Sequence, residues 1–430
     1  MQVSIQTISN FFTKQNRILI SAAVLLLIGL PVSVSLNSEQ QNLQSNAAGM
    51  SSIEPENGTL AGNVTVVNDA AASGGKYVVL GTIVPPTPVP LSCTMGGATG
   101  STASQVFPVN AIPNDATDDT NAIQTAINNA SSAGGGVVTL SAGTYLTNKH
   151  LLLKSNVKLQ GLGSQTVIKA GTSFMNTAGP FGGYPLITSN GASNVTIANL
   201  TADQSGDTLN GNVGTRLTEY LIDIRYTTNA VVDGVSTRNP FTYSIAVVES
   251  TKFCVKNSNT LVATNGKYNQ LDGIHILNSS FGDVISNTVD QRVGADGDDG
   301  LVAHTINGSV HDVTYAGNKV RGGSHGAAMQ FAYTASTDQI YNILVQSNEF
   351  WGSPRGMWTG TYGTPGTSHH VTIGGDSAKG NYFHDNSGNA VDFTGSLSYI
   401  IVTHNRACNS GIFSVGAGTG NVVTNNTTSC

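Results

Sequence analysis

Charged residues are scarce in this chain of 430 residues, where they make up only 10%. This composition argues against a mainly helical protein, which would be rich in Ala, Glu, Lys and Leu. Glycine is abundant instead, at 50 residues, which favours many short strands joined by tight turns. The sequence also lacks an excess of basic residues, since its net charge is −6. We therefore expect no nucleic-acid partner, because nucleic acids favour a basic surface.

Cysteine is also scarce, and the chain has 4. These residues are too few to form the scaffold of so long a chain, and their spacing matches no metal-binding motif. We expect no bound metal and no cofactor. The cysteines still suit an exported protein, in which disulfides persist. They are Cys93, Cys254, Cys408 and Cys430.

The N-terminal residues 1–36 differ from the rest of the chain. Lys14 and Arg17 precede an apolar run over residues 18–36, which is about long enough to span a bilayer. A positive region followed by an apolar one is typical of a secretion signal or an uncleaved anchor. The polar lead is long for a cleaved peptide, and no cleavage site of small residues stands out. We therefore expect a protein that is secreted or anchored at the cell surface, and both forms stay open.

Residues 37–105 have the composition of a linker. Its first part is rich in Ser, Asn and Gln, and a proline-rich stretch at 84–90 forms a stiff extended spacer. Between them, residues 54–82 resemble the opening strands of jelly-roll carbohydrate-binding modules, which carry paired glutamates and a segment like residues 72–78. The other strands of such a module are missing, and a few strands rarely fold alone. We interpret residues 54–82 as a remnant or a partner strand, not as a working sugar-binding domain.

The character of the sequence changes at Val106. Asp118 and Asp119 offer helix-capping side chains before residues 121–130, whose apolar residues follow helical spacing. Three glycines end this helix, and two alternating strands follow. This order of features resembles the start of the pectin-lyase-like right-handed parallel β-helices. In those proteins the helix covers the open first rung, since an uncovered β end invites strand addition.

Downstream, one local pattern recurs: two or three β-branched residues, a small or polar residue, and then Asn. From Asn257 to Asn348 these asparagines follow one another at nearly equal intervals, and such a period indicates a solenoid. Asn tolerates the left-handed backbone of a tight corner. The alternative is a β-sandwich, but its turns recur every ~8–12 residues without a longer period. The asparagines of the pattern are Asn199, Asn257, Asn287, Asn318, Asn348, Asn381, Asn405 and Asn425.

Residues 106–430 therefore predict an all-β domain, a right-handed parallel β-helix with a short N-terminal capping α-helix. The interval from Cys408 to Cys430 is close to that from Asn405 to Asn425, so the two cysteines lie on neighbouring rungs of such a coil. The rung spacing is within the Cα separation that a disulfide tolerates. We predict a disulfide between these two cysteines, whereas nothing in the sequence pairs Cys93 with Cys254.

Three polar clusters lie in one stretch of this coil: at Asp272, at Asp298 and Asp299, and at His325. Asp298 follows Asp272 at the same interval as His325 follows Asp299. Adjacent rungs are ~4.8 Å apart, so we expect the carboxylates on consecutive rungs to flank one site. One rung height plus a sideways offset suits the ~6.5–9.5 Å separation of an inverting glycosidase. Crowded acids cannot all ionise cheaply, so one keeps its proton and can act as the acid.

The clusters resemble the motifs of the polygalacturonase group of glycoside hydrolases, family 28. These motifs run Asn-Thr-Asp, Gly-Asp-Asp, Gly-His-Gly and Arg-Ile-Lys. Residues 269–272 match the first imperfectly, and residues 297–299 match the second fully. Residues 324–326 keep the His-Gly of the third, and residues 355–357 keep the Arg of the fourth.

The resemblance implies a role for each of these side chains. Asp298 would be the general acid, while Asp272 and Asp299 would position and deprotonate the attacking water. His325 would tune the acids, and Arg355 would contact the sugar. The resemblance therefore predicts a glycoside hydrolase that acts on polysaccharide by an inverting mechanism, and we expect it to be a monomer.

The substrate is less defined by the motifs. Met357 stands where the family has Lys, so a neutral or differently charged glycan is as well supported as polygalacturonate. Trp358, with Trp351 and Tyr362 nearby, either stacks on sugar rings or packs against an outer loop.

Other interpretations stay open. A polysaccharide lyase or uronate epimerase on the same fold needs a basic residue to abstract a proton. Lys267, Arg292 and Arg321 are available for this role, but their spacing forms no pattern. Residues 296–300 could instead form a Ca²⁺-binding turn. A β-helix that only binds glycan is the non-enzymatic alternative, because function lies in the site and not in the scaffold. We expect five other histidines to be structural: His304, His311, His369, His370 and His404.

Overall fold

The computed structural model describes residues 64–68, 76–80, 93, 96–98, 100–174, 185–209, 220–262, 271–291 and 297–430. The chain divides into two compact units, Met1–Ile83 and Val84–Cys430. In the first unit, β1 (Val64–Asn68) pairs with β2 (Lys76–Leu80) in an antiparallel hairpin. Residues 1–36 lie outside the described residues, so the prediction of a signal or anchor stays a prediction. Within the described ranges, no helix is long and apolar enough to cross a membrane.

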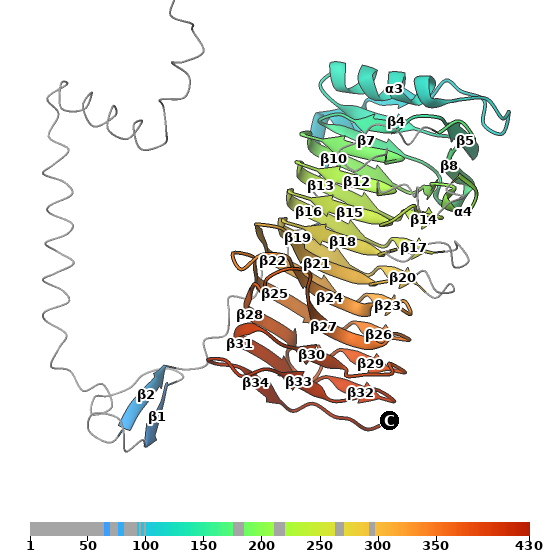
Figure 1. The fold of residues 1–430 in the computed structure, drawn as a ribbon. Coiled ribbons are helices and arrows are strands. Elements are labelled where there is room, and N and C mark those ends of the chain that lie inside the picture. Colours follow the sequence, from blue (N-terminus) through green and yellow to red (C-terminus); the bar gives the residue numbers. More distant parts are fainter. Residues whose placement is uncertain are drawn as a thin grey trace, which may run out of the picture. The chain divides into compact units, whose positions relative to one another are not determined.

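The second unit is a stack of three parallel sheets, drawn in Figure 1. Its first sheet runs through β3 (Val106–Pro108), β4 (Gly136–Thr139), β7 (Val157–Gln160), β10 (Ser193–Ala198), β13 (Thr228–Asp233), β16 (Thr251–Lys256), β19 (Ser280–Ile285), β22 (Ser309–Ala316), β25 (Gln339–Gln346), β28 (Thr367–Gly374), β31 (Ser396–Thr403) and β34 (Val422–Thr424). The second runs through β5 (Gly143–Thr147), β8 (Thr166–Ala170), β11 (Thr201–Asp203), β14 (Ser236–Arg238), β17 (Asn259–Leu261), β20 (Thr288–Asp290), β23 (Lys319–Arg321), β26 (Glu349–Trp351), β29 (Tyr382–His384) and β32 (Arg406–Cys408). The third runs through β6 (Leu151–Leu153), β9 (Ile187–Asn190), β12 (Ile222–Arg225), β15 (Ile245–Val248), β18 (Ile274–Leu277), β21 (Leu301–Thr305), β24 (Ala327–Tyr333), β27 (Arg355–Thr361), β30 (Val391–Phe393) and β33 (Phe413–Val415).

The chain visits the three sheets in turn, so each coil adds one strand to every sheet. This is the architecture of a parallel β-helix, and it is consistent with the predicted right-handed form. The inward positions stack in register: Val313 pairs with Ile343, and Ile343 pairs with Val371. All three side chains are fully or almost fully buried. Stacked β-branched residues of this kind fill a continuous interior, which is what the V/I/T-rich strands predicted.

A ladder of buried asparagines lines one corner of the coil. The backbone N–H of each asparagine donates to the side-chain oxygen of the asparagine one rung further on, as from Asn287 to Asn318 at 3.0 Å. The same contact recurs down the coil through Asn348, Asn381, Asn405 and Asn426. The recurring Asn pattern is thus confirmed as a corner signal. Asn199, Asn257 and Asn425 adopt the left-handed corners that the sequence predicted, with φ between 50° and 55°, and take no place in the ladder.

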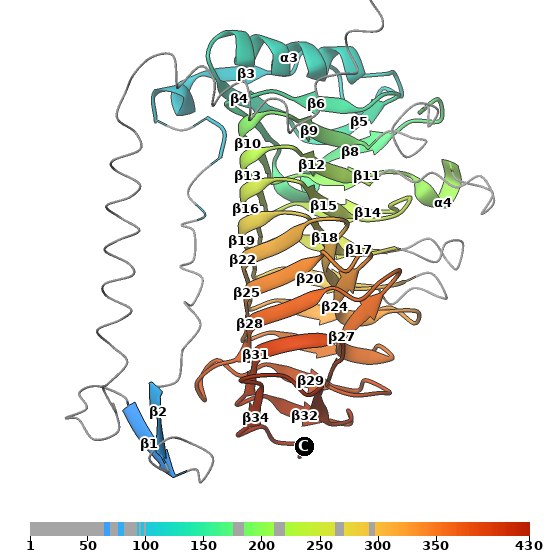
Figure 2. The same cartoon turned by 60° about the vertical axis from the view of Figure 1, so that its left-hand side comes forward.

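Helix α3 (Thr120–Ser132) lies at one end of the stack, as Figure 2 shows, and buries Ile123 and Ile127 against the first strands. Two disulfides close the unit. Cys408 and Cys430 are joined as predicted, with their Cα atoms 4.8 Å apart. The other disulfide joins Cys93 to Cys254. The remaining short helices of the described ranges are η5 (Gly100–Ser104), η6 (Gly163–Gln165) and α4 (Gly206–Leu209).

Candidate active site

The three polar clusters occupy consecutive rungs, as predicted. Each lies where the chain passes from the second sheet to the third, just before β18, β21 or β24. The backbone N–H of Asp298 donates to the carbonyl of Leu271 at 3.2 Å, which ties the second cluster to the first. The N–H of Gly323 donates to the carbonyl of Asp298 at 2.8 Å, which ties the third to the second. The constant interval between the clusters therefore corresponds to one coil of the chain.

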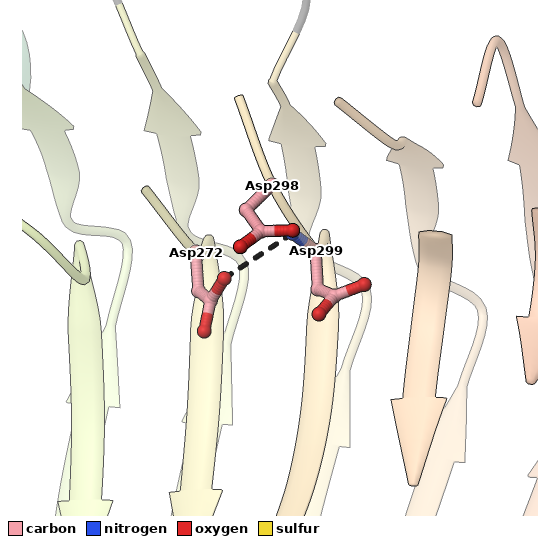
Figure 3. Close-up of side chains that lie close together, drawn as sticks. All are labelled: Asp272, Asp298 and Asp299. Carbon is pink, nitrogen blue, oxygen red and sulfur yellow. Dashed lines mark hydrogen bonds between the residues drawn. The ribbon is translucent and has the colours of Figure 1, made fainter. Parts of the chain in front are cut away.

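The carboxyl groups of Asp272, Asp298 and Asp299 converge on one place. One oxygen of each lies within 4.8 Å of the others. Figure 3 shows the three side chains on two adjacent rungs, with the backbone N–H of Asp299 donating to Asp272 Oδ1 at 3.2 Å. This oxygen spacing is shorter than the ~6.5–9.5 Å that we expected for an inverting pair. Their catalytic role stays a prediction.

The glycine after His325 has a steric reason. A Cβ atom at Gly326 would lie 2.5 Å from Asp298 Oδ1 and 2.6 Å from Asp299 Oδ1. Both distances are too short for any side chain. The third cluster therefore contributes His325 and, at Gly326, the absence of a side chain that would displace Asp298 and Asp299.

Burial controls the ionisation of the three acids. It raises the pKa of Asp272 to about 7. Burial and the nearby charge of Asp272 raise the pKa of Asp298 to about 7, while His325 acts in the opposite direction. Burial and both neighbouring carboxylates raise the pKa of Asp299 well above its usual range, against the Ala327 N–H and Arg355, which lower it. The cluster therefore holds protons near neutral pH, and they belong to the group rather than to one residue.

Hydrogen-bond donors distinguish the three carboxyl groups. Asp272 accepts from the Asp299 backbone, and Asp299 Oδ1 accepts from the Ala327 N–H at 2.6 Å. The amide of Gln330, in the orientation that satisfies its neighbours, donates to Asp299 Oδ2 at 3.1 Å. Among the described residues, no donor reaches the carboxyl group of Asp298. Asp298 is also the least buried of the three.

The predicted sugar-binding residues lie beside this cluster. Arg355 begins β27, one rung beyond Ala327, and its guanidinium lies 4.2 Å from the centre of the Trp358 ring. The indole N–H of Trp358 donates to Gln330 at 3.0 Å, which connects it to Asp299. Trp351 is different, because it lies on β26 in the second sheet and stacks on His384. Of the aromatic residues near Arg355 in the sequence, Trp358 and Tyr362 therefore reach the site.

Two histidines that the sequence analysis did not assign to the site lie directly behind it. Nδ1 of His275 is 2.7 Å from Asp272 Oδ2, and Nε2 of His275 is 3.1 Å from Nδ1 of His304. Burial lowers the pKa of each histidine to about 3, so both rings are neutral. The expectation that His304 is merely structural did not anticipate this contact. The available signal was the Asp-x-x-His spacing at residues 272–275. Asp272 lies in the turn before β18, and His275 lies on that strand.

Asp272, Asp298 and Asp299 are also the described residues that come close enough to hold a cation. Burial disfavours the ionisation that this would require, unless the ion itself supplied the compensating charge. Asp296, which belongs to the alternative Ca²⁺ turn, lies outside the described residues. Of the basic residues considered for a lyase or epimerase, Arg321 ends β23 in the second sheet. Lys267 and Arg292 lie outside the described residues.

Known proteins resemble this chain mainly in fold. The family described as rhamnogalacturonase A/epimerase, pectate lyase-like, matches residues 105–206, which is less than half of the chain and ends before Asp272. No curated protein matches the sequence.

Among solved structures, a hyperthermoactive exopolygalacturonase from Thermotoga maritima is 15% identical, with a TM-score of 0.58 over 73% of this chain and 83% of its own. A polygalacturonase from Erwinia carotovora ssp. carotovora is 15% identical, with a TM-score of 0.51 over 77% of this chain and 98% of its own. A tailspike protein of E. coli bacteriophage HK620, in complex with a pentasaccharide, is 17% identical, with a TM-score of 0.50 over 74% of this chain and 63% of its own. The resemblance to pectin-lyase-like β-helix proteins is therefore confirmed, and at these identities it establishes the shared fold.

Proposed function

We propose that this protein is an exported polysaccharide-active enzyme, and specifically a glycoside hydrolase. The observation that carries the proposal is the convergence of two buried carboxyl groups and a partly buried one, with all three pKa values raised, chiefly by burial. Such crowding keeps at least one acid protonated near neutral pH, which hydrolysis of a glycosidic bond needs. The polygalacturonases and the saccharide-bound tailspike among the structural neighbours support a glycan substrate.

The roles follow from exposure and hydrogen bonding. Asp298 is the proton donor, because it is the least buried of the three and receives from the described residues no hydrogen bond that would favour its ionised form. Asp272 and Asp299 accept backbone hydrogen bonds, which favour their ionised forms against the burial that raises their pKa values, and we assign them as the carboxylates that hold and deprotonate water. His325 favours the ionised form of Asp298 and so tunes its acidity. Arg355 and Trp358 contact the sugar.

Inversion at the anomeric carbon is part of the proposal, since the family 28 resemblance implies it. The short oxygen separation is the observation that weighs against it, because retaining enzymes place their carboxyl groups only ~5–5.5 Å apart. The anomeric configuration of the first product, followed by proton NMR within minutes of mixing, decides between the two. An initial product of retained configuration would refute inversion while leaving hydrolysis intact.

The substrate is proposed to be a neutral glycan, or one charged differently from polygalacturonate. Met357 is fully buried in the third sheet, so no cation occupies that position of the motif. Arg355 remains to meet a carboxylate or hydroxyl groups. We further propose that α3 covers the first rung of a right-handed coil, that residues 1–36 direct export or anchor the chain, and that the protein acts as a monomer.

Reaction products test the function directly. Purified protein is incubated with a panel of neutral and acidic polysaccharides, and new reducing ends are measured alongside ultraviolet absorbance of unsaturated sugars. Reducing ends without absorbance support hydrolysis, and absorbance indicates a lyase. Binding without either product indicates a uronate epimerase or a glycan-binding β-helix. Asp272→Asn and Asp299→Asn are expected to abolish most of the hydrolysis, since each removes a carboxylate that acts on the water.

A further inference from the structure

We infer that His275 is a positioning residue for Asp272, and that His304 fixes the direction of their hydrogen bond so that Asp272 only accepts. The inference rests on the proposed function, in which Asp272 must be ionised to act on water. It deepens that proposal by naming what holds this carboxylate in its working form. The family 28 motifs assign no role to either histidine.

Both oxygens of Asp272 are held from opposite directions. Oδ1 accepts from the Asp299 backbone N–H at 3.2 Å, and Oδ2 is 2.7 Å from Nδ1 of His275. Asp272 and His275 are both almost fully buried, with 4% and 2% of their surfaces exposed. Water is therefore a poor substitute for either partner. The carboxylate keeps one orientation only while both donors are in place.

The ring of His275 has little freedom to rotate. Tyr243 stacks on it with ring centres 4.2 Å apart and planes within 6° of parallel, and Tyr220 stacks on Tyr243 at 4.7 Å. The edge of His304 meets it from another side at 5.2 Å. Packed rings of this kind lock a rotamer, which is what a group that positions a catalytic carboxylate requires.

The His275–His304 contact selects one hydrogen-bond direction. A neutral imidazole has one N–H and one bare nitrogen, so each ring must donate through one nitrogen and accept through the other. If His275 donates through Nδ1 to Asp272, its Nε2 accepts from Nδ1 of His304. The remaining Nε2 of His304 is then a bare acceptor.

The opposite hydrogen-bond direction, from Asp272 through His275 to His304, costs more free energy. Asp272 would donate to His275, and His275 would donate to His304, which leaves an N–H at Nε2 of His304. That nitrogen is buried and has no partner among the described residues. Buried N–H groups without an acceptor are rarer than unsatisfied acceptors. The chain of bonds therefore runs from His304 through His275 to Asp272, and it favours Asp272 as a carboxylate.

The kinetic test compares two substitutions at His275. His275→Leu removes the donor to Asp272 and is expected to lower kcat about 10- to 100-fold, the range for loss of a hydrogen bond to a charged group, with KM changed little. His275→Asn places an amide N–H near the position of Nδ1 and is expected to recover most of kcat. His369→Leu on β28, in the first sheet, removes a stacked histidine that contacts none of the three acids and should match the wild type.

A spectroscopic test does not depend on finding a substrate. Long-range proton–nitrogen NMR of histidine-labelled protein reports which ring nitrogen carries the proton, and the His275→Asn spectrum assigns the signals. Neutral rings protonated at Nδ1 in both His275 and His304 are expected at about pH 8, where Asp272, whose pKa burial raises to about 7, is ionised. A wild-type His275 protonated at Nε2 would overturn the inference, as would a His275→Leu enzyme with wild-type kcat.

The two proposals fail in different ways. If the wild type releases no sugar from any polysaccharide, the proposed function fails, and the protonation pattern alone decides the hydrogen-bond direction. If the wild type is active but the Asn variant is no better than the Leu variant, the glycosidase stands and the positioning role falls. A His275→Leu chain that does not fold leaves the decision to the wild-type spectrum.

Discussion

Replacing Gly326 with alanine perturbs the acid cluster by steric contact alone. The added Cβ would lie 2.5 Å from Asp298 Oδ1, 2.6 Å from the backbone carbon of Asp298 and 2.6 Å from Asp299 Oδ1, whereas ordinary contact begins at 3.4 Å. The cluster must therefore shift, because a backbone carbon cannot rotate away as a side-chain oxygen can. A misplacement of about 1 Å can reduce the rate about 10²-fold. We expect a loss of that size in kcat.

Release of reducing ends from the best substrate of the panel measures the effect, and thermal unfolding monitors the fold. Gly416→Ala is the matched control, since its nearest neighbour would be 3.5 Å away, at ordinary contact distance. It should change neither kcat nor the melting temperature. The steric reasoning fails if Gly326→Ala retains wild-type kcat. It fails equally if a crystal structure of that variant shows the carboxyl groups of Asp298 and Asp299 unmoved.

Three further predictions follow from the same geometry, and a fourth concerns the C-terminal disulfide. Asp298→Asn should leave the fold intact but cut hydrolysis about 10²- to 10⁴-fold, the usual contribution of a general acid. Asp296→Asn and added chelator should be nearly silent, whereas the Ca²⁺ turn would make both as harmful as Asp298→Asn. Because the pKa of Asp272 rises from 3.8 to about 7 on folding, the folded state binds more protons than the unfolded state between these values. Stability should therefore fall as pH rises from 3.8 to about 7, and less steeply in Asp272→Asn when melting is followed at each pH. Cys408→Ser opens the disulfide that closes a sequence separation of 22, and it should lower the free energy of unfolding in urea by ~3 kcal/mol. An unchanged urea midpoint would contradict that last estimate.

The sequence by itself was enough to predict a coil and the place of its acids. Stacked V/I/T strands, corner asparagines and a nearly constant period are local and repetitive features, and repetition in the chain becomes repetition in space. The interval between Asp272 and Asp298 matches one coil, and it therefore placed both residues on one wall. The same logic predicted the Cys408–Cys430 disulfide, because neighbouring rungs leave little freedom in how far apart two residues lie.

Only the tertiary structure decided what surrounds the acids. Which asparagine enters the buried ladder depends on one residue of register at each corner, so the pattern could not separate Asn425 from Asn426. The contact of His275 with Asp272 depends on which way a side chain points as a turn becomes a strand. The contact of Gln330 with Asp299 joins two rungs and follows no motif. The sequence named the charged groups, whereas burial, packing and hydrogen-bond direction, which set how those groups ionise, arise when distant parts of the chain close around them.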